Sequence, residues 1–126
     1  MGIGRIEDAT ATHKLAATLF GQTGDHANEG KTLFALSCAL VQSGRSQESI
    51  TVLDQYLKLC RSTVDRPGEA TALHLIGAVL VDLRRLEEAI TASHEAAVIF
   101  REIGDHEAEN AALTNLATAR QALGRP

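Results

Sequence analysis

Histidine and cysteine are the residue types in this sequence that could bind a metal ion, and their spacing argues against a metal site. The chain has five His and two Cys residues. A helical zinc site places two ligands at i and i+4, or uses a Cys-x-x-Cys pair, and neither pattern occurs. His26 and His106 occupy equivalent positions in the first turns of predicted helices, whereas His13 and His94 lie far apart in the chain. We therefore predict no metal ion and no other cofactor.

Cys38 could act as a nucleophile only with a base and an orienting group close by. His74 is the candidate base, because it belongs to a neighbouring predicted helix. Both Cys38 and Cys60 lie in helical segments, which favours reduced cysteines that fill the core. His74 has two interpretations: a groove residue that responds to ligand or pH, or, as we favour, a partly buried histidine with a hydrogen-bonded partner. We predict no catalytic residue and expect a protein that is not an enzyme.

Composition and charge exclude several classes of partner. The formal net charge is −4, so the clustered Lys and Arg that bind a nucleic-acid backbone or an anionic membrane surface are missing. No apolar run approaches the roughly 20 residues of a membrane span, and no apolar signal-peptide region follows Met1. The glycine pairs Gly2/Gly4 and Gly21/Gly24 follow no strand, so they indicate no phosphate loop. We expect a cytoplasmic protein.

The whole sequence repeats with a period of 40 residues. A shift of 40 superposes aspartates, leucines and the pairs Gly4-Arg5, Gly44-Arg45, Arg84-Arg85 and Gly124-Arg125. A period in this range indicates stacked structural units, each made of one helix pair. Few aromatic residues (3%) are available, so the core must consist of Ala, Leu, Ile and Val.

Signals for helix starts and ends divide the chain into six helices within a single domain, residues 1–126. Asp25, Asp65 and Asp105 stand at N-cap positions, and Gly24 and Gly104 precede two of them, where a left-handed residue is needed. The expected ranges are about 5–22 for a first helix, 26–43 with 46–63 for one repeat, 67–83 with 86–103 for the next, and 106–123 for a half repeat. Boundaries of this kind are accurate to a few residues.

The helix at 67–83 is predicted to be the central one. From Ala72 to Leu83 only His74 and Asp82 are polar, and a helix that is apolar nearly all round is buried on most sides. His74, Ala78 and Asp82 are spaced by four residues, so they form the one stripe expected to face water. Arg84 replaces glycine in the turn that follows, which indicates either strain or a different turn geometry.

The pattern in these helices resembles the tetratricopeptide repeat family. The first helix of that repeat carries a large residue, then Leu-Gly, then another large residue, as in Leu73, Ile76-Gly77 and Leu80. A small residue where the second helix crosses the first is matched by Ala9, Ser49 and Ala89. Tyr56 departs from a second small position, held by Ala16 and Ala96, and Arg120 departs from the last large residue of the first helix. The 40-residue variant is similar to repeats in actinobacterial regulators.

The resemblance implies an all-α fold, a right-handed α-α superhelix of about six antiparallel helices. It also implies a concave groove that binds a protein or peptide partner, as in a bacterial regulatory or signalling protein. The groove residues implied by position are Lys31, Phe34, Cys38, Val41, Thr71, His74, Ala78, Val81, Thr114, Asn115, Thr118 and Gln121. Too few Lys, Arg and Asn residues are present for the clamp with which some family members hold C-terminal carboxylates.

The two ends of the array suggest a second possibility. The order begins with the second helix of a repeat and ends with the first helix of one, so apolar residues of the helix at 5–22 lack a partner. These residues are Ile6, Leu15, Leu19 and Phe20. Either the sequence is part of a longer array, or the open ends pair between chains as a homodimer or a head-to-tail assembly. The alternative function is therefore a self-assembling structural repeat module.

Overall fold

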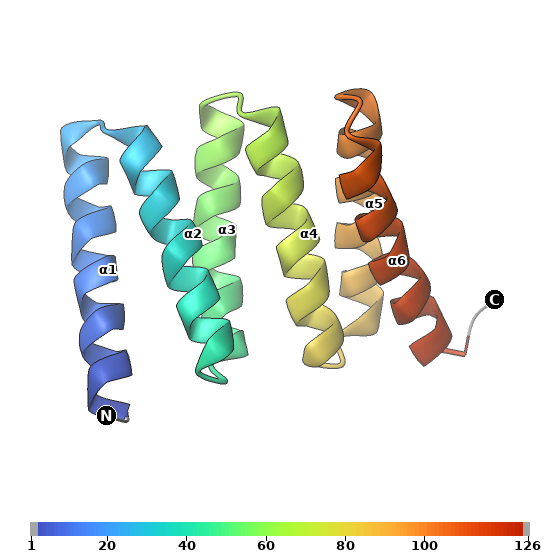
Figure 1. Cartoon of the computed structure of the whole chain (residues 1–126), viewed down its shortest axis with the longest axis horizontal. Coiled ribbons are helices and arrows are strands. Elements are labelled where there is room, and N and C mark those ends of the chain that lie inside the picture. The colour runs from blue at the N-terminus through green and yellow to red at the C-terminus, as the bar shows by residue number, and fades with distance from the viewer. Residues whose placement is uncertain (1–2, 125–126) are drawn as a thin grey trace.

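The protein consists of six α-helices in the residues that the structure, a computed structural model, describes: 3–124 for the backbone and 7–124 for the side chains (Figure 1). They are α1 (Ile3–Thr23), α2 (His26–Gln42), α3 (Ser46–Ser62), α4 (Arg66–Asp82), α5 (Leu86–Glu102) and α6 (His106–Ala122). No strand occurs within 3–124. The predicted all-α class is confirmed, and each helix begins and ends within two residues of its predicted range.

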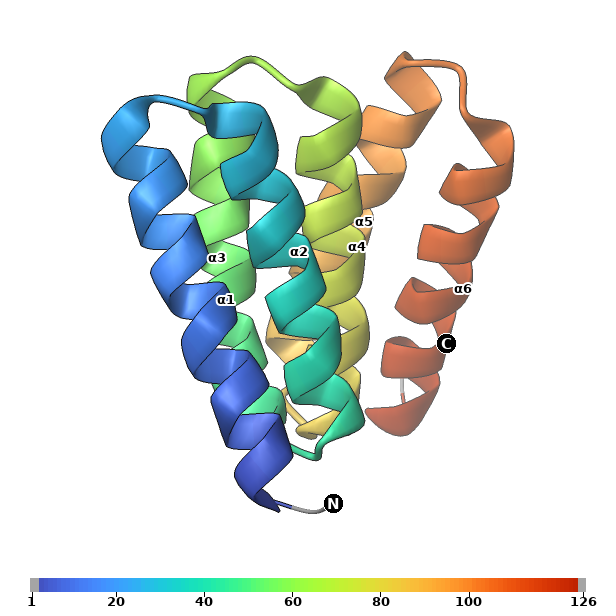
Figure 2. The same cartoon turned by 60° about the vertical axis from the view of Figure 1, so that its left-hand side comes forward.

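Successive helices run antiparallel and form two layers. Helices α2, α4 and α6 form the front layer in Figure 1, and α1, α3 and α5 form the other layer, which Figure 2 shows from the side. Each helix packs against the next one in the chain, and α4 also contacts α6 directly. Helix α4 therefore touches three other helices, as expected for the central element.

Local chemistry sets where the helices begin and end. The side chains of Asp25, Asp65 and Asp105 accept hydrogen bonds from backbone N–H groups three residues on, which confirms the three predicted N-caps. Every connecting turn contains a residue with positive φ, at positions 24, 44, 64, 84 and 104, and residue 124 after α6 also has positive φ. Four of these residues are glycines; the other two are Val64 (φ 55°) and Arg84 (φ 62°). Arg84 thus keeps the glycine geometry and carries strain.

Small residues allow the paired helices to approach closely. A Cβ atom added to Gly77 on α4 would lie 2.5 Å from Ser93 Oγ on α5. In the preceding pair, Ser49 Oγ on α3 donates a 3.2 Å hydrogen bond to the backbone oxygen of Ser37 on α2. The equivalent crossing points of the two repeats therefore use glycine or serine to bring the backbones together.

The buried apolar residues form two clusters. A larger cluster spans α3 to α6 and includes Leu53, Leu80 and Phe100. A smaller cluster spans α1 to α3 and contains Ala17, Leu33, Leu36, Leu40 and Val52. Tyr56 is partly buried and packs against both clusters. The two halves of the stack are thus joined mainly through α3.

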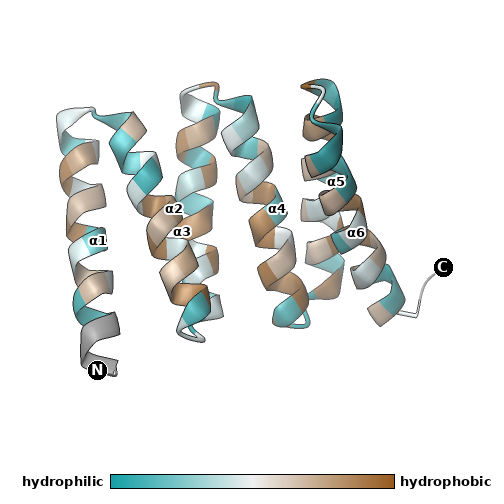
Figure 3. Cartoon of the chain, in the orientation of Figure 1, coloured by the Kyte–Doolittle hydropathy of each residue, from teal (hydrophilic) through white to brown (hydrophobic). Residues whose placement is uncertain are grey.

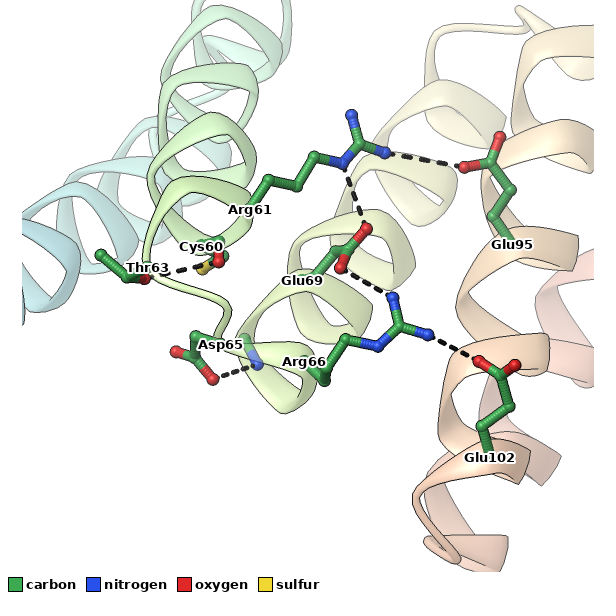
Figure 4. Close-up of polar contacts among 9 residues, drawn as sticks. Cys60, Arg61, Thr63, Asp65, Arg66, Glu69, Glu95 and Glu102 are labelled. Carbon is green, nitrogen blue, oxygen red and sulfur yellow. Dashed lines mark hydrogen bonds and ion pairs between the residues drawn. The ribbon is translucent and has the colours of Figure 1, made fainter.

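A chain of ion pairs links three helices near the α3–α4 turn (Figure 4). The carboxylate of Glu69 on α4 forms ion pairs with the guanidinium groups of Arg61 on α3, at 3.1 Å, and of Arg66 on α4, at 3.0 Å. Arg66 also forms an ion pair with Glu102 on α5, at 2.6 Å, and Arg61 forms one with Glu95 on α5, at 3.8 Å. These contacts hold the start of α4 against its two neighbours.

Candidate peptide-binding groove

One depression borders the upper half of α2, in the orientation of Figure 1. It has a volume of about 590 Å³ and lies between α2 and the C-terminal half of α3. Its apolar wall includes Phe34, Tyr56, Leu59 and Cys60. Lys31 stands at its exposed rim, and Asp65, the N-cap of α4, borders it as well. The site is open, mostly apolar and flanked by a few charges.

The departure of Tyr56 from the repeat pattern shapes this depression. A Cβ atom on Gly30 would lie 3.4 Å from Tyr56 Cε1, so glycine leaves room for the ring. The Tyr56 ring meets Phe34 edge to face, with 6.0 Å between ring centroids. Burial is the main cause that raises the pKa of Tyr56 to about 12, so its phenol is neutral and can donate a hydrogen bond. Gly30 and Tyr56 line the depression but were not among the predicted groove residues, although a glycine inside a helix and an aromatic residue at a small-residue position are signals in the sequence.

A second depression follows lower down the same face, between α2 and α4. It has a volume of about 250 Å³ and is floored by Ser49 and Leu53 of α3. Cys38 and Val41 of α2 line one side, and Ala78 of α4 lines the other. Gln42 and Asp82 stand at its end. We call the two depressions together the α2–α4 groove. Figure 3 colours much of the middle of α2 and α4 as hydrophobic.

Five of the twelve predicted groove residues line this groove, namely Lys31, Phe34, Cys38, Val41 and Ala78. The other seven line neither depression: Thr71, His74, Val81, Thr114, Asn115, Thr118 and Gln121. Thr71, Thr114 and Thr118 are partly or fully exposed, and their hydroxyls donate to the backbone of their own helices. The residues that line the two depressions thus come from α2, α3, α4 and the α3–α4 turn, and none of them belongs to α6.

His74 lies at the contact between α4 and α6 and lines neither depression. Its Nδ1 is 3.4 Å from Asn115 Nδ2, and its ring meets Phe100 edge to face at 6.5 Å. Burial lowers the pKa of His74, so the ring is neutral and Nδ1 can accept the hydrogen bond from Asn115. The geometry is that of a partly buried histidine with a polar partner, as favoured from the sequence.

Neither cysteine has the surroundings of a nucleophile. Cys60 is buried, which is the main cause that raises the pKa of its thiol and keeps it protonated. Cys38 is partly exposed in the lower depression, and His74 is not among the residues lining it. Among the side chains that the structure describes, no three His, Cys, Asp or Glu groups come together as a metal site.

The predicted self-association residues on α1 differ in exposure. Leu15 and Leu19 are 61% and 50% exposed, and Phe20 is partly buried. Ile6 lies outside the residues whose side chains are described. Within the described residues, no helix is long and apolar enough to cross a lipid bilayer.

A two-layer stack of antiparallel helix pairs, repeated every 40 residues and grooved along one face, defines a helical-repeat solenoid. Residues 68–126 match the family model of the tetratricopeptide repeat. The resemblance inferred from the sequence is thereby confirmed for this part of the chain. No curated protein matches the sequence.

Solved structures show the same fold. The crystal structure of nearly identical TPR-like repeats from a presumed kinesin light chain of Podosopora anserina superposes with a TM-score of 0.77 and 19% identity, over 97% of this chain. A single-residue variant of that protein gives a TM-score of 0.78 and 18% identity. The chain spans 61% and 60% of the lengths of those two structures. Tetratricopeptide repeats are in general protein-interaction scaffolds without catalytic activity, and this chain has that architecture.

Proposed function

We propose that this chain is a protein-binding module that holds an extended segment of a partner in the α2–α4 groove. The observation that carries the proposal is the pair of apolar depressions along one face of α2, both open to solvent. Apolar concavities with a few polar groups at the rim are the usual form of a binding site. The resemblance to actinobacterial repeats is the basis for a role of this module in the cytoplasm, as part of a bacterial regulatory protein.

A selection of random peptides displayed on phage against the whole chain tests this function. Peptides enriched on the wild type should lose binding to Val41→Arg, which fills the lower depression. They should keep binding to Val98→Arg, a matched change at an exposed valine of α5 that lines neither depression. Failure to enrich any peptide, or equal binding to both variants, would contradict the proposal.

Alkylation of Cys38 gives an independent measure of groove occupancy. Cys38 is partly exposed in the lower depression, whereas Cys60 is 2% exposed and serves as an internal control. A bound peptide should slow the reaction of Cys38 with iodoacetamide, followed by mass spectrometry, and leave Cys60 unreactive throughout. Unchanged reactivity of Cys38 with saturating peptide would mean that the peptide binds elsewhere.

Exposed leucines favour a second candidate function, self-assembly through α1 and α6. Leu113 on α6 is 41% exposed, although the equivalent Leu33 and Leu73 are 4% and 5% exposed beneath the next helix. Leu19 on α1 is exposed, although the equivalent Ile99 is buried. Pairing α6 of one copy with α1 of another would cover both leucines in the same way that α4 pairs with α5.

The oligomeric state decides this second candidate. We expect light scattering to show association that weakens when Leu15 and Leu19 are both changed to glutamate. The variant Val98→Glu removes an exposed valine elsewhere and should leave the mass unchanged. A monomeric wild type at high micromolar concentration would eliminate self-assembly and leave the groove proposal untouched.

A further inference from the structure

The two ends of the α2–α4 groove carry opposite charges. Lys31 borders the upper depression and Asp82 borders the lower one. Both side chains belong to exposed residues, and neither forms an ion pair or a side-chain hydrogen bond with any other residue that the structure describes. The apolar lining between them has no charge of its own.

The other charges at the upper end are already engaged. The carboxylate of Asp65 accepts a 3.0 Å hydrogen bond from the backbone N–H of Gly68 at the N-terminus of α4. That terminus carries the positive end of the helix dipole, which offsets much of the Asp65 charge. The ring of His26 contacts Glu29 at 3.0 Å. Lys31 is therefore the charge at this end that remains for a ligand.

The spacing of the two charges defines the length of ligand that could meet both. Lys31 and Gln42, the α2 neighbour of Asp82 in the lower depression, are eleven residues apart on one helix. At a rise of 1.5 Å per residue this is about 17 Å. An extended peptide covers that distance with about five residues, since each adds roughly 3.3 Å.

We propose that the α2–α4 groove selects an extended peptide with an acidic residue over Lys31, a basic residue beside Asp82, and about four apolar or small residues between them. This inference rests on the proposed function and assigns its ligand class. Alternate side chains of an extended segment point to the same side, so two of the four intervening side chains can enter the two depressions. Lys31 and Asp82 are the specificity-determining residues.

Charge reversal tests the inference with the same phage-displayed library. Peptides enriched on the wild type should carry opposite charges about five residues apart. Lys31→Glu should enrich peptides with basic residues at both ends, and Asp82→Lys should enrich peptides with acidic residues at both ends. The double variant should return to the opposite-charge pattern. A synthetic wild-type consensus peptide should bind each single variant roughly fivefold more weakly, as expected for exposed charge pairs.

Matched controls separate local pairing from a change in net charge. Lys58→Glu and Asp54→Lys make the same charge changes at exposed positions of α3 that border neither depression, and they should leave the enriched pattern unchanged. Groove-dependent peptides with the same charge pattern on all variants would overturn this inference and leave the proposed function standing. The absence of any groove-dependent peptide would remove both.

Discussion

Val64 is the most strained residue that the structure describes in the turns. It occupies the position of Gly24 and Gly104 in the repeat, with φ of 55°. A β-branched residue in the left-handed region is a conformational outlier, and the left-handed conformation costs an L-residue roughly 1–2 kcal/mol. Because Val64 is 79% exposed, its side chain contributes little packing in return.

Val64→Gly should therefore stabilise the protein by about 1 kcal/mol. Urea unfolding followed by circular dichroism would measure the free energy of unfolding. The reciprocal change at the equivalent turn, Gly104→Val, should cost a similar amount. Equal stability of wild type and Val64→Gly would mean that the turn is not strained.

His74 should make stability depend on pH. Its pKa is lowered in the folded state by burial, so the unfolded chain binds a proton more readily. Stability is then fully present above the ordinary histidine pKa of about 6.5 and is lost as pH falls from there through the folded-state pKa. His74→Gln should show a smaller loss over this range in urea unfolding, because it removes the buried imidazole. Parallel pH profiles would contradict this interpretation.

At the scale of the helices, Glu69 is the centre of the ion pairs that join α3, α4 and α5. It is the least exposed of these charged side chains and meets two arginines. Glu69→Gln should lower the free energy of unfolding by about 1 kcal/mol, because both arginines lose their shared partner. The loss should shrink in high salt, which screens exposed charges.

The matched control for Glu69 is Glu102→Gln, which removes a more exposed carboxylate at the edge of the same network. It should change stability by less than about 0.5 kcal/mol. Comparable losses for the two variants, measured by urea unfolding at low salt, would show that burial of Glu69 is not what strengthens the network.

The helices themselves were predictable, because their signals are local. The aspartates at 25, 65 and 105 mark three N-caps in any context, and a 40-residue period places the rest. The upper depression was not predictable in the same way. It depends on the packing of the Tyr56 ring against Gly30. This is a contact between two helices, and neither residue alone indicates it. His74 was assigned a partner in general terms, but its pairing with Asn115 depends on how α6 packs against α4.

At the scale of the molecule, the two apolar clusters predict uneven stability. Among the side chains that the structure describes, the cluster around α1 and α2 has fewer buried residues than the one that spans α3 to α6. Regions with less buried apolar area open at lower free energy. Amide hydrogen exchange should therefore be faster in α1 and α2 than in α4 and α5.

Leu36→Ala should increase the difference in stability between the two halves of the stack. Leu36 is fully buried in the smaller cluster, and such truncations cost about 2–5 kcal/mol. Exchange in α1 and α2 should accelerate strongly while α5 changes little, as measured by mass spectrometry of peptic fragments. Equal acceleration in every helix would show that the stack unfolds as one cooperative unit.

The residues with positive φ recur every twenty positions, from Gly24 to Gly124, and this limits how the length of the chain can change. Deleting residues 45–84 removes forty residues and joins Gly44 to Arg85, so the Gly-Arg turn survives and α5 follows α2 in the place of α3. Deleting residues 45–64 joins Gly44 to Asp65, which also makes a good turn, but it puts a front-layer helix into the back layer. Viable insertions and deletions should therefore come in whole steps of forty residues, although the turns alone would tolerate twenty.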